Sequence, residues 1–210
     1  WSAIYGGGPV SRVRRAVRTG HEKMLTEATT WLTATHPTPG TLLDAGCGTG
    51  LFTVEMASRG YQVTATDIAP RMVTATRTAA DEANVGDNVQ TITSDLSTVS
   101  GAYDAVACFD VLVHYSSDDF APLLAHLAER ANHTLLFTFA PYNRLLAALH
   151  WIGGHFPKGE RRTEIQMIRD DLVIKTLANA GMSISHRVSI SHGVYHVELI
   201  AATRQHNASN

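Results

Sequence analysis

Cysteine is scarce in this sequence, which holds only Cys47 and Cys108 among its 210 residues. Both lie in apolar runs that look like strands or strand ends. A chain of this length with two cysteines is poorly described as a disulfide scaffold. We therefore expect two reduced thiols and a cytoplasmic location.

An excess of charge and a long hydrophobic run are missing as well. The formal net charge is -2, so no global field attracts nucleic acid, and we expect no nucleic-acid partner. The longest apolar stretch outside the candidate strands is Leu145–Phe156. It is shorter than the roughly 20 residues that a membrane-spanning helix needs. Because the sequence begins at Trp1, without a signal-peptide pattern, we expect further residues upstream.

The sequence also lacks the spacings that mark a protein-bound metal. Its eleven histidines form no HExxH or similar pair with a third ligand. His192 and His196 in "HGVYH" fall on a predicted turn and strand, not on one helix face. We therefore predict no protein-bound metal. Internal repeats and low-complexity segments are absent too, which favours one domain over residues 1–210.

The apolar pattern that is present predicts an α/β fold. Between Leu42 and Phe139, short β-rich runs alternate with helical patterns, which is typical of a parallel sheet covered on both faces. The predicted strands are Thr41–Ala45, Gln62–Thr66, Val89–Thr93, Ala105–Phe109, Thr134–Phe139, Ser183–Ser189 and Val194–Ala201. The predicted helices are Gly20–Ala34, Gly50–Ser58, Pro70–Ala83, Asp118–Arg130 and Arg169–Ala180. Residues 1–36 form an N-terminal arm, and residues 140–168 are interpreted as a cap insertion over the sheet.

Three glycines at alternate positions follow the first strand in "LLDAGCGTG". Such loops occur in both dinucleotide and S-adenosylmethionine sites, so the loop alone does not name the ligand. The spacing Gly46-x-Gly48-x-Gly50 differs from the G-x-G-x-x-G of a diphosphate site. Asp44, two residues before, would repel a diphosphate and attract the ammonium group of a sulfonium ligand. The loop therefore favours S-adenosylmethionine over NAD.

Two further acids end the next two strands. Asp67 in "VTATD" can accept hydrogen bonds from ribose hydroxyls, and Asp95 in "TSDL" from an adenine amino group, with Leu96 beside the ring. Each glycine or acid alone could serve a turn or a helix cap, but acids at three successive strand ends together favour a nucleoside site. The predicted cofactor-binding residues are Asp44, Gly46, Gly48, Gly50, Asp67, Ile68, Met72, Asp95, Leu96 and Phe109.

These motifs resemble the class I S-adenosylmethionine-dependent methyltransferases. That resemblance implies a Rossmann-like, mostly parallel sheet of seven strands with an antiparallel last strand and helices on both faces. Over nearly the whole chain, "IYGGGPVSRVRRAVRTGHEKML", "YDAVACFDVLVHY", "LLFTFAPYN" and "FPKGERRTEIQMI" resemble the magnesium-protoporphyrin IX O-methyltransferases of chlorophyll and bacteriochlorophyll biosynthesis. Two details depart from that pattern, because the insertion lacks a Phe-Pro-Gly start and "FAPYN" lacks a lysine after the proline.

The family reaction implied by this resemblance is methyl transfer from S-adenosylmethionine to a porphyrin propionate, giving a monomethyl ester and S-adenosylhomocysteine. Magnesium then arrives inside the substrate. His114 matches a functional histidine of the family and can orient the propionate; Tyr5 matches a tyrosine on a mobile arm. The resemblance further implies handover from the large subunit of magnesium chelatase and peripheral contact with a photosynthetic membrane.

The porphyrin itself should need an apolar wall and basic groups at one rim. The wall is predicted from Leu145, Leu146, Leu149, Trp151, Ile152 and Phe156, and the rim from Lys158, Arg161 and Arg162, with Arg12, Arg14, Arg15 and Arg18 for the second propionate. Helical spacing alone equally fits a core helix and a solvated turn. Two alternatives stay open: a methyltransferase for another small molecule, such as a quinol or an amine, and a catalytically silent porphyrin carrier.

Overall fold

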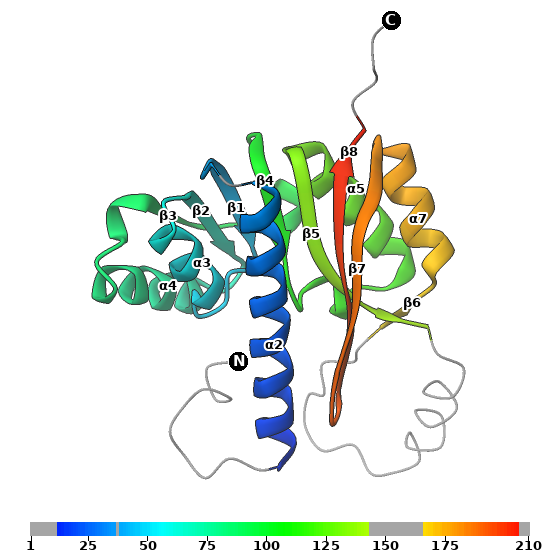
Figure 1. The fold of residues 1–210 in the computed structure, drawn as a ribbon, viewed down its shortest axis with the longest axis horizontal. Coiled ribbons are helices and arrows are strands. Elements are labelled where there is room, and N and C mark those ends of the chain that lie inside the picture. The colour runs from blue at the N-terminus through cyan, green and yellow to red at the C-terminus, as the bar shows by residue number, and fades with distance from the viewer. Residues whose placement is uncertain (1–11, 37, 143–165, 206–210) are drawn as a thin grey trace, which may run out of the picture.

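Seven strands of the computed structural model lie side by side in the order β3-β2-β1-β4-β5-β8-β7, and the short β6 pairs with β5 (Figure 1). The structure describes residues 12–36, 38–142 and 166–205. The strands are β1 (Thr41–Ala45), β2 (Gln62–Asp67), β3 (Val89–Thr93), β4 (Tyr103–Cys108), β5 (Ala131–Pro141), β6 (Met167–Ile168), β7 (Met182–His192) and β8 (Tyr195–Arg204). The helices are α2 (Arg12–Thr35), α3 (Leu51–Ser58), α4 (Pro70–Glu82), α5 (Ser117–Arg130) and α7 (Asp170–Asn179), with 3-10 turns η1 (Gly86–Asn88), η2 (Leu96–Thr98) and η3 (Leu112–His114).

The pairing of the strands confirms the predicted fold class. β1 to β5 run parallel to one another, β8 pairs antiparallel with β5, and β7 pairs antiparallel with β8. The chain winds outward from β1 to β3 and then returns to place β4 on the other side of β1. At such a reversal the loops at the carboxyl ends of the strands diverge, and ligands bind in the crevice between them.

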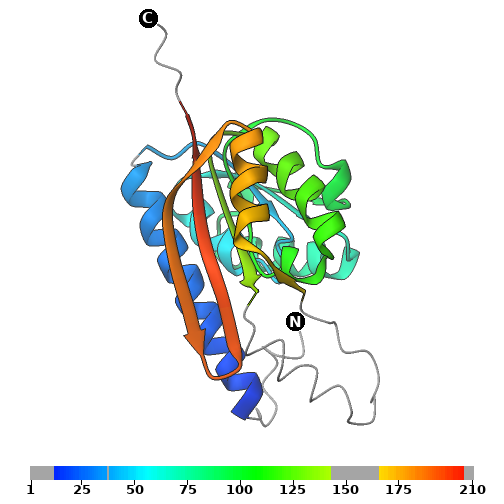
Figure 2. The same cartoon turned by 90° about the vertical axis from the view of Figure 1, so that its right-hand side faces the viewer.

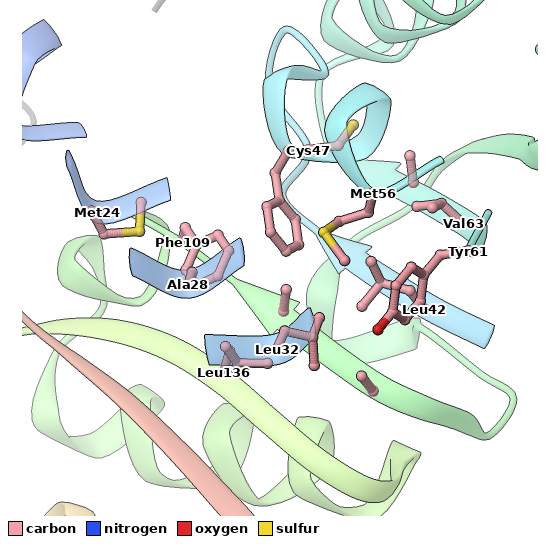
Figure 3. Close-up of a cluster of buried hydrophobic side chains, with 14 of the residues drawn as sticks. Met24, Ala28, Leu32, Leu42, Cys47, Met56, Tyr61, Val63, Phe109 and Leu136 are labelled. Atoms are coloured by element: carbon pink, nitrogen blue, oxygen red, sulfur yellow. The ribbon is translucent and has the colours of Figure 1, made fainter. Parts of the chain in front are cut away.

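Helices cover both faces of the sheet, as Figure 2 shows with α2 on one side and α5 and α7 on the other. Met24, Ala28 and Leu32 recur every four residues along α2 and are fully buried. Figure 3 shows this stripe beside residues of the sheet, such as Leu42 and Leu136. On the opposite face, α5 buries its own stripe of Phe120, Leu124 and Leu127. The two stripes hold the helices on a sheet whose strands are apolar on both sides.

Several element boundaries differ from the predicted ones for local reasons. α2 begins at Arg12, eight residues before the predicted start at Gly20. Gly20 does not start the helix but lies inside it, against the ring of Tyr195. β4 ends at Cys108 and not at Phe109, because the chain turns at Asp110, whose φ is 55°. β7 extends beyond its predicted bounds at both ends, whereas β8 begins at Tyr195, one residue after the predicted start, and continues beyond Ala201 to Arg204.

The two cysteines are buried, unpaired thiols, as expected. Within the described ranges, no helix combines the length and the apolar character needed to cross a bilayer.

Candidate active site

A cavity of about 370 Å³ opens at the carboxyl ends of β1, β2 and β4. This size falls in the range of small-molecule sites, roughly 300–1,000 Å³. Among the described residues, its lining consists of His21, Leu25, Asp44, Gly46, Cys47, Gly48, Thr49, Leu51, Phe52, Asp67, Ile68, Ala69, Met72, Phe109, Asp110, Val111 and His114. The cavity thus lies at the reversal of strand order, where the sequence predicts the ligand.

Eight residues predicted to act in cofactor binding or catalysis line this one cavity. They are Asp44, Gly46, Gly48, Asp67, Ile68, Met72, Phe109 and His114. They come from the ends of three strands and from α4, so the sheet brings together motifs that are up to 70 residues apart in the chain. Gly50 lies next to this set, as the residue that precedes α3, in a left-handed conformation with φ 84°.

Asp44 and Asp110 are buried acids of the described cavity lining, and Asp44 has only 3% of its surface exposed. The Thr53 hydroxyl donates a hydrogen bond of 2.5 Å to its Oδ2 atom. Burial raises the pKa of Asp44 to about 6, and the hydrogen bond from Thr53 opposes that shift. At neutral pH the group is therefore a carboxylate in a poorly solvated place, which favours a cationic ligand group beside it.

The glycine loop leaves room for a ligand at Gly48. A Cβ atom built at this position would meet no other heavy atom within 4 Å, and the residue's φ is 56°. The loop is held against β2, because the backbone N–H groups of Gly46 and Cys47 both donate to the carbonyl oxygen of Thr66, at 2.7 and 2.8 Å. An S-adenosylmethionine-type ligand could therefore approach the backbone closely, so these residues fit that cofactor.

Asp67, the last residue of β2, lies beside the glycine loop and is fixed by two backbone groups. Its Oδ2 atom accepts from Gly48 N–H at 3.1 Å and its Oδ1 atom from Ala69 N–H at 2.8 Å. Because each carboxylate oxygen can accept more than one hydrogen bond, both retain capacity for ribose hydroxyls. The side chain of Ile68 beside it is 66% exposed. This exposure suits an apolar contact with a bound nucleoside.

Asp95 and Leu96 are outside the cavity lining as the structure describes it. Asp95 caps the η2 turn, accepting from the backbone N–H of Ser97 at 2.8 Å and from its hydroxyl at 2.6 Å. The hydrogen bonds from Ser97 lower the pKa of Asp95. Leu96 belongs to the buried cluster on the α5 face. The sequence left open that Asp95 caps a helix, and the structure shows it in such a capping role. Adenine binding by Asp95 and Leu96 stays a prediction.

The turn after β4 supplies the other side of the cavity. Phe109 packs edge-on against Phe52, with ring centroids 4.9 Å apart. Asp110 adopts a left-handed conformation, and its backbone N–H donates to the Thr138 hydroxyl at 2.7 Å. His114 follows on η3, where it is exposed and lines the cavity. The turn therefore places an accessible imidazole at the cavity that also holds Asp44 and Asp67.

Sequence reasoning missed a buried network around Asp110. The His21 Nδ1 atom lies 2.7 Å from Asp110 Oδ2, and the Tyr195 hydroxyl donates to both carboxylate oxygens at 2.9 Å. Both partners are at least 85 residues from Asp110 in the chain. The only signal for His21 was its place in the long N-terminal motif, and nothing in the sequence marked Tyr195.

Several predicted site residues lie outside the described residues. These are Tyr5, the apolar wall from Leu145 to Phe156, and the basic residues Lys158, Arg161 and Arg162; the side chains of Arg12 and Arg14 are also outside the description. Arg18 pairs with Glu22 on the exposed side of α2, at 2.8 Å, and Arg15 is exposed. Within the described part of the chain, no group of three or more His, Cys, Asp or Glu residues is arranged to hold a metal ion.

Comparison with known proteins places this geometry among the methyltransferases. Residues 108–204 match the family model described as magnesium-protoporphyrin IX methyltransferase C-terminus, and residues 42–133 match a methyltransferase domain. A magnesium-protoporphyrin O-methyltransferase of Synechocystis sp. is 34% identical over 97% of this chain and 90% of the relative. The chloroplastic enzyme of Arabidopsis thaliana is 34% identical over 96% of this chain and 66% of the relative. The crystal structure of the Synechocystis enzyme with bound S-adenosylhomocysteine superposes with a TM-score of 0.88, at 33% identity, covering 98% of this chain and 93% of that one.

Proposed function

Because this chain belongs to the magnesium-protoporphyrin IX methyltransferase family, we propose that it methylates a propionate carboxylate of magnesium-protoporphyrin IX. The products are the monomethyl ester and S-adenosylhomocysteine. The observation that carries the proposal is the cavity in which Asp44, Asp67 and His114 meet. In this cavity, acids suited to a cationic nucleoside lie together with the accessible imidazole of His114, which follows β4.

The proposed reaction depends more on how the protein positions the propionate than on proton transfer. A propionic acid resembles a glutamate side chain, whose pKa is about 4.3, so the nucleophile is already an anion at neutral pH. S-adenosylmethionine, when bound, supplies an electrophilic methyl group. The protein must then hold one carboxylate oxygen in line with that group and keep water out. No strong general base is required.

Each described residue has one task in this scheme. Asp44 attracts the cationic amino-acid end of the cofactor and Asp67 accepts from its ribose. Phe52 and Phe109 supply an apolar boundary that limits water in the cavity. His114 donates a hydrogen bond that orients the propionate. That bond must be moderate, because an interaction that stabilises the reactant anion more than the transition state would slow the reaction.

Two finer proposals concern partners and location. We propose that the substrate comes from the large subunit of magnesium chelatase and that the protein is cytoplasmic, with peripheral contact to a photosynthetic membrane. The supporting observation is the family membership alone. Retention of the protein on membranes that carry the chelatase subunit, and its release when that subunit is removed, would test both.

The test of the main proposal is a product assay with the full chain. Magnesium-protoporphyrin IX and S-adenosylmethionine are mixed with the protein, and the products are separated by chromatography. The expected result is a monoester formed in equal amount to S-adenosylhomocysteine. A binding spectrum without any ester would favour the silent carrier, and turnover of a quinol but not of the porphyrin would favour the other small-molecule enzyme.

A further inference from the structure

We infer that His21 binds the carboxylate of the amino-acid part of S-adenosylmethionine, and that Asp110 and Tyr195 position its ring for this task. The inference rests on the cofactor part of the proposed function and is independent of the porphyrin. The carboxylate has to be recognised somewhere in the cavity, because the methionine part of the ligand carries one negative and one positive group on the same carbon.

The charges around the cavity leave few candidates for that role. Its described lining contains three acids, Asp44, Asp67 and Asp110, and no lysine or arginine. A carboxylate placed among acids needs a compensating cation or a set of donors. Among these described lining residues, only the two histidines can carry a positive side chain. The choice is therefore between His21 and His114.

Position decides between the two histidines. The ammonium group is assigned to Asp44, so the carboxylate on the same carbon must find its partner close to Asp44. His21 is such a neighbour, because it lines the same cavity as Asp44; burial raises the pKa of Asp44, and the charge of His21 is among the effects that oppose this rise. His114 lies on η3, beyond β4, where it is assigned to the propionate of the substrate. In this assignment, His21 binds the carboxylate of the cofactor and His114 binds the propionate of the substrate.

The network behind His21 is built to hold the ring still. Asp110 is 6% exposed and His21 13% exposed, with 2.7 Å between Oδ2 and Nδ1. Tyr195 donates to the same carboxylate from β8, and the Thr138 hydroxyl lies 3.3 Å from it on β5. A carboxylate partner fixes the proton on Nδ1 and so sets the ring's orientation. With Nδ1 directed at Asp110, the ring presents Nε2 to the ligand's carboxylate, to which its N–H would donate.

A second histidine–carboxylate pair offers a matched control. His186 on β7 lies 3.0 Å from Glu27 on α2, so it also joins α2 to the C-terminal strands. It stacks on Trp31 with centroids 5.9 Å apart and is absent from the described cavity lining. Replacing His186 therefore removes a comparable link without touching the ligand.

The experiment compares two ligands by calorimetry: S-adenosylhomocysteine and its decarboxylated analogue, which keeps the adenosine, the sulfur and the amine. The wild type should prefer the carboxylated ligand by roughly 10- to 100-fold, the range for a hydrogen bond between charged groups. In His21→Gln this preference should fall to about threefold or less, whereas His186→Gln should keep it. Tyr195→Phe, which retains the packing of the ring, should lower the preference partially. Melting curves of each variant check that it is folded.

Each outcome bears on one proposal. If His21→Gln keeps the full preference for the carboxylated ligand, His21 does not bind that carboxylate and the inference is wrong. If both His21→Gln and His186→Gln lose the preference, the effect is a general loosening of α2, which also overturns it. If the wild type binds neither ligand, the proposed methyltransferase function itself fails.

Discussion

The two sides of the cavity are assembled in different ways. On the side of β1 and β2, the partners are at most 19 residues away in the chain: Thr53 for Asp44, and Gly48 and Ala69 for Asp67. On the side of β4, Asp110 is fixed by residues 85 and 89 positions away. Contacts that are short-range in the chain make the side of β1 and β2 recognisable as a sequence motif. The Asp110 network on the side of β4 depends on long-range contacts and is visible only in the folded protein.

The strongest separation of the two sides should come from His114→Ala. Because His114 is assigned to the propionate and not to the cofactor, turnover should fall roughly 10²- to 10³-fold, through lost orientation of the reacting groups. The affinity for S-adenosylhomocysteine should stay near that of the wild type. Rapid-quench measurement of ester formation, with calorimetry of the cofactor product, checks both numbers. Unchanged turnover would remove His114 from the mechanism.

On the cofactor side, Asp44 should make the ligand-free protein less stable as the pH rises. Its pKa is about 6 in the folded protein, against an ordinary value of 3.8, so the folded state alone holds the proton between about pH 4 and 6. Stability should therefore fall by about 3 kcal/mol as the pH rises through this window.

Denaturant titrations of Asp44→Asn at several pH values test this linkage. The variant should lose that pH dependence and bind S-adenosylhomocysteine more weakly. Asp95→Asn, which removes an acid outside the described cavity lining, should keep the fall. If the Asp44→Asn curve has the same slope as the wild type, Asp44 is not the group responsible.

Removing the ribose acceptor should have a somewhat smaller effect, confined to the cofactor. Asp67→Ala should weaken S-adenosylhomocysteine binding by about 1.5–3 kcal/mol, the range for hydrogen bonds to a charged group. Asp67→Asn keeps one acceptor oxygen and should lose less. Equal cofactor affinity in Asp67→Ala and the wild type would rule out the ribose assignment.

The smallest predicted effect concerns the packing of Gly20 against Tyr195, on the side of the cavity that long-range contacts hold together. A Cβ atom at Gly20 would lie 2.3 Å from the Tyr195 ring, so Gly20→Ala should destabilise the protein by about 1–2 kcal/mol. Helix propensity alone predicts the opposite, a gain of roughly 1 kcal/mol. In a Tyr195→Ala background the substitution at Gly20 should therefore become neutral or stabilising. Urea unfolding of the four proteins in this cycle measures the coupling.

The same contrast explains which elements and site residues could be predicted from the sequence alone. β1 and β3 were placed at their observed bounds, and Pro70 marked the start of α4, because apolar runs and a helix-start residue are local signals. The acids of the first two strand ends were found for the same reason. Asp95 carries an equally plain signal, yet a short polar residue after a strand also caps a turn, and the sequence does not separate the two roles.

The Asp110 network shows why the rest could not be predicted. Whether His21 reaches Asp110 depends on how α2 lies across the sheet, and that position is set by buried contacts of Met24, Ala28 and Leu32 with distant strands. Tyr195 joins the network only because β8 inserts between β5 and β7. Contacts between residues so far apart in the chain leave no pattern within a single sequence segment.

Methyl transfer to a carboxylate is tested most directly by following a labelled methyl group. S-adenosylmethionine with a ¹³C-methyl group is incubated with the protein and magnesium-protoporphyrin IX, and the product is examined by NMR before and after alkaline hydrolysis. We predict one new methyl-ester signal on the porphyrin, which alkali converts to labelled methanol. Label that remains on S-adenosylmethionine, or a methyl signal on the porphyrin that resists alkali, would contradict the assignment of this protein as a carboxyl methyltransferase.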